Sequence, residues 1–210
     1  MRSIRLTWLA LTVCVAAITT PLRAQIPADV KPILEKVEEW FDDAEGLDVN
    51  MTGKVMTLKV SIHSRTKGDK GIVTMGTTLF GKTVQMLIGT DGKQSWMYDE
   101  TGQTLTIEQS PVMPKDDNNV DLGLVKEYKK AVMKQAGDSY EITLTEPKSK
   151  DSPGKMVLTV HGSDCRPTKM VIGSGMKKMS MTIESIKKGV PDNVFVLDTS
   201  KFPNAKIVRK

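Results

Sequence analysis

The sequence predicts a mainly β fold of the α+β class, in which two or three helices cover one strongly curved antiparallel sheet of about ten strands. Three observations support this prediction. Residues 72–107 and 140–186 alternate between apolar and polar residues, with turn sequences at hairpin spacing. An amphipathic segment precedes the first of these meanders, and a second amphipathic segment separates the two. A sheet with one apolar face can bury that face by curving around such helices.

The N-terminus has the features of a secretory signal peptide. Two arginines precede an apolar run at residues 6–18, and Pro21 and the small residue Ala24 follow it. The run is shorter than the roughly 20 apolar residues that a membrane span needs. We therefore expect cleavage near Ala24, which removes residues 1–24 and leaves residues 25–210 as a single exported domain.

Composition and motifs give no support for nucleic-acid binding, metal binding or catalysis. Loss of the leader, with its three arginines and no acids, lowers the formal net charge from +5 to +2. Cys165 is then the one remaining cysteine, so no internal disulfide can form. His63 and His161 fit no metal-ligand spacing and no Ser-His-Asp order. The sequence therefore predicts no enzyme, no cofactor and no metal.

Residues 29–44 are predicted to form the first helix. Asp29 is a suitable N-cap, Pro32 lies in the first turn, and Gly46 follows the end. The apolar residues at helical spacing are Val30, Ile33, Leu34, Val37, Trp40, Phe41 and Ala44. Residues 49–62 are predicted to form one long strand, in which Met56, Leu58, Val60 and Ile62 alternate, with a possible bulge at Gly53.

Residues 76–83, GTTLFGKT, satisfy the pattern of a phosphate-binding loop, G-x-x-x-x-G-K-[ST]. That motif needs a strand before the loop and a helix after it. Here the alternation has period two on both sides, which predicts a hairpin with Gly81-Lys82 as its turn. Leu79 then lies opposite Val84, and the motif predicts no nucleotide binding.

Two further turns continue this meander. A three-residue loop at 91–93 would place Ile88 beside Trp96, and a four-residue loop at 100–103 would place Trp96 beside Ile107. One face of four strands would then be largely apolar, with Val73, Met75, Thr77, Leu79, Val84, Met86, Ile88, Trp96, Tyr98, Leu105 and Ile107. The opposite face would be polar and solvated.

The rest of the chain is predicted from the same patterns. Residues 110–119 are expected to form a loop, and residues 120–136 an amphipathic helix that Gly137 ends. The expected strands of the second meander are residues 140–145, 155–161, 168–173 and 178–186, with a short strand at 194–197 before the tail.

Methionine is unusually frequent, with thirteen residues in the chain and all but Met1 beyond the leader. Its flexible, polarizable side chain suits surfaces that adapt to variable apolar partners. The same residues could instead fill a core. A copper(I) site at residues 175–181, GMKKMSM, is disfavoured because Met179 and Met181 follow strand alternation and no histidine or cysteine lies nearby.

Two motifs and their order resemble a known family. The sequence has D-G-K-x-x-W-x-Y-D at residues 91–99 and Y-x-I-x-L-x-x-P-K at residues 140–148. With the leader, the first helix and the basic tail, these features resemble the periplasmic LolA-like lipoprotein carriers and their relative LolB across residues 25–210. The ending FPNAKIVRK resembles carriers of the Bacteroidetes.

The resemblance implies an unclosed antiparallel β-barrel whose helices form a lid over an apolar cavity. It implies a monomeric periplasmic carrier, without cofactor or nucleotide, that moves acylated lipoproteins from release machinery at the inner membrane to an acceptor at the outer membrane. The residues expected to line the lipid cavity are Trp40, Phe41, Met56, Leu58, Met75, Leu79, Met86, Ile88, Trp96, Tyr98, Leu105 and Ile107.

The sequence departs from the family at one point. The better-known carriers have a basic residue and a proline on the second strand, and a buried arginine holds the lid. The predicted second strand here, GIVTMGTTLF at residues 71–80, has neither. Two alternatives stay open: a lipid- or lipoprotein-sensing module of the same fold in envelope-stress signalling, and an interaction protein whose sheet packs only its own core.

Overall fold

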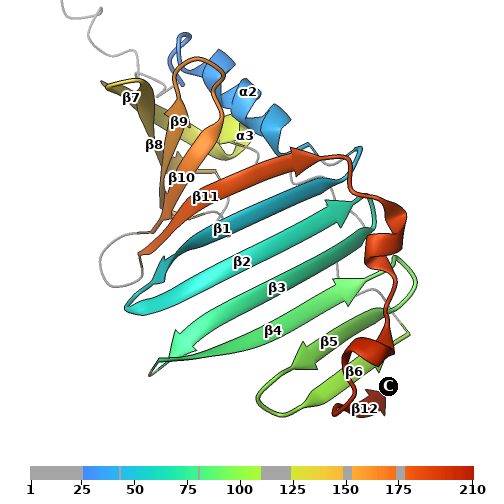
Figure 1. The fold of residues 1–210 in the computed structure, drawn as a ribbon. Coiled ribbons are helices and arrows are strands. Elements are labelled where there is room, and N and C mark those ends of the chain that lie inside the picture. The colour runs from blue at the N-terminus through green and yellow to red at the C-terminus, as the bar shows by residue number, and fades with distance from the viewer. Residues whose placement is uncertain (1–25, 43, 80, 110–123, 149–152, 174–177) are drawn as a thin grey trace, which may run out of the picture.

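Twelve strands form one sheet in the computed structural model (Figure 1), which describes residues 26–42, 44–79, 81–109, 124–148, 153–173 and 178–210. The strand order is β12-β6-β5-β4-β3-β2-β1-β11-β10-β9-β8-β7. Every neighbouring pair is antiparallel except β12 and β6, which are parallel. Since β12 and β7 lie at opposite edges, the sheet does not close. The predicted fold class, an unclosed and curved antiparallel sheet with a helical cover, is confirmed.

The first half of the chain supplies one helix and six strands, namely α2 (Lys31–Trp40), β1 (Leu47–Val55), β2 (Leu58–Lys67), β3 (Lys70–Leu79), β4 (Lys82–Thr90), β5 (Ser95–Asp99) and β6 (Thr104–Glu108). The second half supplies α3 (Leu124–Glu127), β7 (Tyr128–Ala136), β8 (Ser139–Pro147), β9 (Lys155–His161), β10 (Pro167–Ile172), β11 (Met179–Lys188), η2 (Asp192–Phe195), η3 (Thr199–Lys201) and β12 (Lys206–Arg209). Among the described helices, none is long and apolar enough to cross a membrane.

One core surrounds α2 on the side of the sheet that we call the helix face, which bears Val49, Ala131 and Leu144. Leu34 and Val37 of α2 are fully buried in it. β1 and β7 are five strand spacings apart, about 24 Å across a flat sheet, whereas a helix is only about 10 Å wide. The sheet must therefore bend toward α2, and Figure 1 shows β7–β10 at a steep angle to β1–β4. The helix face is the concave one.

A second core lies on the opposite side, which we call the tail face. Here residues 190–205 of the C-terminal segment pack against β3, β5 and β6. The buried members are Ile72, Trp96, Leu105, Ile107, Val190 and Phe195. Figure 1 shows this segment running from the end of β11 to β12 beside β6. One sheet thus supports two separate cores on its two faces.

Asp192 joins the C-terminal segment to the β2–β3 hairpin. Its carboxylate lies 3.0 Å from Lys67 Nζ and 3.5 Å from Lys70 Nζ. The hydrogen bond from Lys67, and then the charges of both lysines, hold the pKa of Asp192 below its ordinary value of 3.8. A carboxylate with a lowered folded-state pKa stabilises the fold above its ordinary pKa, and this contribution is lost as the pH falls through the lowered value.

We therefore expect Asp192→Asn to lower the free energy of unfolding at pH 7 by a small amount, because both ion pairs are exposed to solvent. The difference between the two proteins should shrink as the pH falls below 3.8. Urea unfolding from pH 7 to pH 2.5 measures it. A difference that stays constant across this range would contradict the assignment.

The predicted single strand at residues 49–62 is wrong, because the chain reverses at Met56-Thr57. Val55 pairs with Leu58, so β1 and β2 form a hairpin with a two-residue turn. Met56 has a positive φ of 57°, which a non-glycine residue adopts at some cost. No Gly or Asn marks the turn. The bulge lies between Asn50 and Met51 instead of at Gly53.

The predicted helix at residues 120–136 is also wrong for its larger part. Residues 120–123 lie outside the described residues, α3 occupies one turn, and β7 follows directly. Ala136 pairs with Ser139, so Gly137, with φ of 62°, opens a two-residue hairpin turn. A glycine with positive φ ends many helices and also forms many hairpin turns, so Gly137 fits both readings.

The C-terminal segment differs from its prediction too. Residues 192–195 form a 3₁₀ turn where a strand was expected at 194–197, because Phe195 points into the tail-face core. β12, which pairs with β6, has no counterpart among the predicted strands. The four strands predicted at 140–186 are confirmed as β8 to β11. The predicted loop at 110–119 and the leader at 1–24 lie outside the described residues.

Candidate functional site

The apolar face predicted for four successive strands is divided between the two sides of the sheet. Thr90 pairs with Ser95, so the loop between β4 and β5 has four residues instead of three. Ile88 therefore lies beside Met97, and Gly89 lies beside Trp96. A register shift of one residue moves every following side chain to the other face. The predicted pairing of Ile88 with Trp96 is wrong, whereas Trp96 does lie beside Ile107 as predicted.

Asp91 fixes the length of this loop. Its Oδ1 accepts hydrogen bonds from the backbone N–H groups of Lys93 and Gln94, both at 2.9 Å. Burial acts to raise the pKa of Asp91, but these bonds outweigh it and hold the pKa below its ordinary value. The carboxylate is ionised at neutral pH, which strengthens both bonds.

Gly89 is the sequence signal that identifies the true register. A Cβ at this position would overlap the indole ring of Trp96. Trp96 therefore requires a residue without a side chain opposite it, and the aromatic ring covers the glycine in return. Ile88, the partner predicted for Trp96, could not have made this room.

We expect Gly89→Ala to lower the free energy of unfolding by about 1–3 kcal/mol, because the added methyl group displaces the buried Trp96 ring. Gly154→Ala is a matched control, since a Cβ there meets nothing within 4 Å. Its effect should stay within about 0.5 kcal/mol. Urea denaturation of both variants compares them. Equal effects at the two glycines would contradict the described packing of Trp96.

Four of the predicted cavity residues belong to the tail-face core. Trp96, Leu105 and Ile107 are almost fully buried there. Tyr98 is half-buried, and its ring centroid lies 4.6 Å from that of Phe202 in the C-terminal segment. Their predicted position on the same face as Met86 and Ile88 is wrong, because the four-residue loop turns them to the other side.

The helix face of β2–β5 carries the remaining apolar side chains in one continuous strip. Met75 pairs with Met86, and Val73 pairs with Ile88. Met86 is 37% exposed and Met97 is 43% exposed. We call this surface the apolar strip, and its members are Val60, Ile62, Val73, Met75, Val84, Met86, Ile88 and Met97. None of the eight belongs to either core cluster.

The strip includes three predicted site residues and several that the prediction missed. Met97 alternates with Trp96, so the predicted three-residue loop places it on the polar face. The four-residue loop turns it to the helix face. Leu58 and Met56 lie at the far end of the β1–β2 hairpin, where Met56 is 66% exposed. The predicted turn at Gly81-Lys82 and the predicted pairing of Leu79 with Val84 are wrong, because Lys82 begins β4 and pairs with Leu79.

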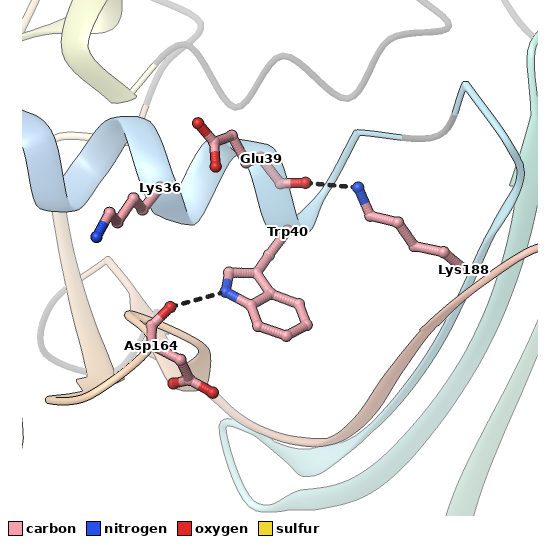
Figure 2. A pocket seen from close by; sticks show the side chains of 5 residues that line it. All are labelled: Lys36, Glu39, Trp40, Asp164 and Lys188. Carbon is pink, nitrogen blue, oxygen red and sulfur yellow. Dashed lines mark hydrogen bonds between the residues drawn. The ribbon is translucent and has the colours of Figure 1, made fainter.

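The end of α2 is tied to the rim of the sheet (Figure 2). Trp40 Nε1 donates to the backbone oxygen of Asp164 at 3.2 Å, and Lys188 Nζ donates to the backbone oxygen of Glu39 at 2.9 Å. These residues and Lys36 line a cavity of about 370 Å³. Phe41, one residue on, is buried in the helix-face core. Both predicted lid residues therefore lie where α2 meets β9–β11.

The departure from the family was expected on the second strand, which the sequence predicts at residues 71–80. This strand assignment is wrong. Residues 71–79 belong to β3, and the second strand is β2, which carries Arg65. Arg65 faces away from α2, because it lies beside Ile72 on the tail face. Arg65 therefore does not hold α2. Lys188 on β11 donates to the backbone oxygen of Glu39 near the end of α2.

A Ser-His-Asp cluster in the β9–β10 turn does not have the geometry of a catalytic triad. Ser163 Oγ and Asp164 Oδ1 both approach His161 Nδ1, at 2.9 and 3.4 Å. A triad needs the acid and the nucleophile on different ring nitrogens. No group of three or more metal-ligating side chains occurs among the residues that the structure describes.

Comparisons with known proteins identify similar folds. No protein-family model matches the sequence, and no curated protein matches it. An uncharacterised conserved protein of Thermus thermophilus is similar in structure, with a TM-score of 0.47 and 16% identity over 87% of this chain and 99% of that one. In the MucA/MucB complex of Pseudomonas aeruginosa the similar chain gives a TM-score of 0.44 and 12% identity, over 86% of this chain and 64% of that one.

A LolA superfamily protein of Nitrosomonas europaea is also similar, with a TM-score of 0.36 and 16% identity over 80% of this chain and 97% of that one.

Proposed function

We propose that this protein is an exported carrier that shelters the acyl chains of lipoproteins on the apolar strip and moves them from the inner to the outer membrane. The observation that carries the proposal is a concave sheet face whose apolar side chains stay outside both cores. Soluble monomers rarely leave a large continuous apolar surface without a partner.

The chemistry of the strip suits acyl chains. Three of its members are methionines, whose unbranched side chains adapt to a flexible hydrocarbon. Each methylene group that a lipid buries there contributes about 0.8 kcal/mol. Polar residues border the strip, with Thr77 between Val60 and Val84 and Asp99 opposite Met86. An acyl chain needs none, since its recognition depends on buried apolar area.

The strip continues toward the core beneath α2. Ile62 pairs with Met51 of β1, and Met51 packs against the helix-face core. A bound chain can therefore extend from Met97 across β4, β3 and β2 to the edge of the region that α2 covers. The signal peptide predicted at residues 1–24 supports a periplasmic location for this function. The release machinery of the inner membrane and an outer-membrane acceptor are the partners proposed by family resemblance.

Native mass spectrometry of the protein purified from the periplasm of its own host tests the proposal. We expect one acylated lipoprotein or lipid per chain. A protein that is empty, and that stays empty when offered a diacylated lipopeptide, would contradict the carrier function. An interaction protein that only packs its own cores would then be the better account.

A further inference from the structure

A second cavity, of about 400 Å³, lies between the tail face and the C-terminal segment. Its volume falls within the range of about 300–1,000 Å³ that is typical of small-molecule sites. It is separate from the apolar strip, because the strip lies on the other face of the same strands. The sheet contributes Ile72, Leu87 and Trp96 to its wall, and the C-terminal segment contributes Val194, Val196, Leu197 and Phe202.

The polar part of the wall includes a guanidinium group without a partner. Arg65 makes no hydrogen bond or ion pair among the residues that the structure describes, and its Nε is buried without an acceptor. Arg65 is itself only partly accessible to solvent. A half-buried cation without a counter-charge loses hydration that nothing replaces.

Two carboxylates that lie near Arg65 in the fold, one on the neighbouring strand and one in the cavity wall, are engaged elsewhere. Asp48, its neighbour on β1, accepts hydrogen bonds from His63 and Asn50. Asp198 lines the same cavity, but its Oδ1 accepts from the backbone N–H and the hydroxyl of Ser200, at 3.1 and 2.6 Å. The cavity wall therefore offers Arg65 several apolar side chains and one carboxylate, that of Asp198, whose Oδ1 is already engaged by Ser200.

Lys201 adds a second positive charge to the cavity wall. Against the single negative charge of Asp198, the two cations leave a net charge of +1, which suits a monoanion. The bonds from Ser200 also hold the pKa of Asp198 below its ordinary value, so this balance is present at neutral pH.

We propose that this cavity binds a single-chain monocarboxylate amphiphile. Its carboxylate pairs with the guanidinium of Arg65 and with the ammonium group of Lys201. Its hydrocarbon chain packs against Ile72, Leu87 and Trp96. A planar guanidinium matches a carboxylate through two parallel hydrogen bonds, so the head group determines the orientation of the chain.

Isothermal titration calorimetry of the purified exported protein with sodium decanoate tests this site. We expect saturable binding of one decanoate per chain, and weaker binding of decanol, which has the same chain without the charge. Arg65→Gln should weaken decanoate binding at least about tenfold, because it removes the charge-assisted hydrogen bonds to the carboxylate. Lys59→Gln is the matched control, an exposed cation on the same strand and face but outside the cavity.

Two further variants keep the test decisive. Lys201→Gln changes an exposed side chain, so it should weaken binding without affecting folding even if Arg65→Gln fails to fold. Met86→Asp alters the apolar strip and should leave decanoate binding unchanged. Absence of binding, equal affinity for decanol, no effect of either cation variant, or loss of binding in Met86→Asp would each overturn the proposal.

Discussion

Aspartate at Met86 or at Met97 is expected to weaken binding of a diacylated lipopeptide at least about 100-fold, because an ionised carboxylate in an acyl-chain surface is either desolvated or keeps the chain away. Both methionines are more than a third exposed before the ligand binds. The free energy of unfolding should therefore change by no more than about 0.5 kcal/mol in Met97→Asp. It should fall somewhat more in Met86→Asp, whose carboxylate lies opposite that of Asp99. Fluorescence titration with a labelled lipopeptide and urea denaturation measure the two effects separately.

Thr83→Asp is the control for this prediction. Thr83 lies on the same strand as Met86, is exposed, and faces the other side of the sheet. It introduces the same charge without altering the apolar strip, so lipopeptide binding should be unchanged. Equal losses in Thr83→Asp and Met86→Asp would mean that charge alone, and not the helix face, determines binding.

The second large effect is expected at Phe195. This side chain is 1% exposed and packs in the tail-face core. Phe195→Ala should lower the free energy of unfolding by about 3–5 kcal/mol, through lost burial and the cavity left behind. Its neighbour Val196 is 65% exposed, so Val196→Ala should change the same quantity by less than about 0.5 kcal/mol. Urea unfolding followed by tryptophan fluorescence provides the comparison.

Lipopeptide binding distinguishes the roles of the two faces in the same variants. A Phe195→Ala protein that still folds should bind the lipopeptide with unchanged affinity, because Phe195 lies in the tail-face core and not on the apolar strip. A loss of binding in a folded Phe195→Ala protein would place the lipid on the tail face and contradict the assignment of the strip.

Alternation in the sequence predicts the strands of both meanders, but it does not predict the face of β5, for which Gly89 opposite Trp96 is the signal. Alternation identifies which residues of one strand share a side. The relation between two strands depends on the length of the loop, and residues 91–94 differ from the predicted loop by a single residue. That residue decides whether Trp96 or Met97 shares a side with Met86.

Other differences arise from long-range contacts. Met56-Thr57 forms a turn without glycine or asparagine because β1 and β2 pair on both sides of it. The Lys-rich segment at 128–136 forms a strand because β8 pairs with it across Gly137. β12 depends on its pairing with β6, about a hundred positions earlier in the chain. Local propensity contains none of this information.

For the candidate site, the sequence identifies Met75, Met86 and Ile88 as neighbours on one apolar surface, and the structure agrees. It does not separate them from Trp96, Tyr98, Leu105 and Ile107, since all seven are apolar residues at alternating positions. Burial distinguishes the two groups, because the C-terminal segment covers only one side of the sheet.

The most direct test of the carrier proposal is photo-crosslinking with a diacylated lipopeptide that carries a diazirine in one acyl chain. The protein is irradiated with this probe, digested, and the labelled residues are identified by tandem mass spectrometry. We predict labels on the apolar strip, at Met75, Met86, Ile88 and Met97. Labels confined to Ile72, Leu87 and the C-terminal segment, or no specific label at saturating lipopeptide, would contradict it.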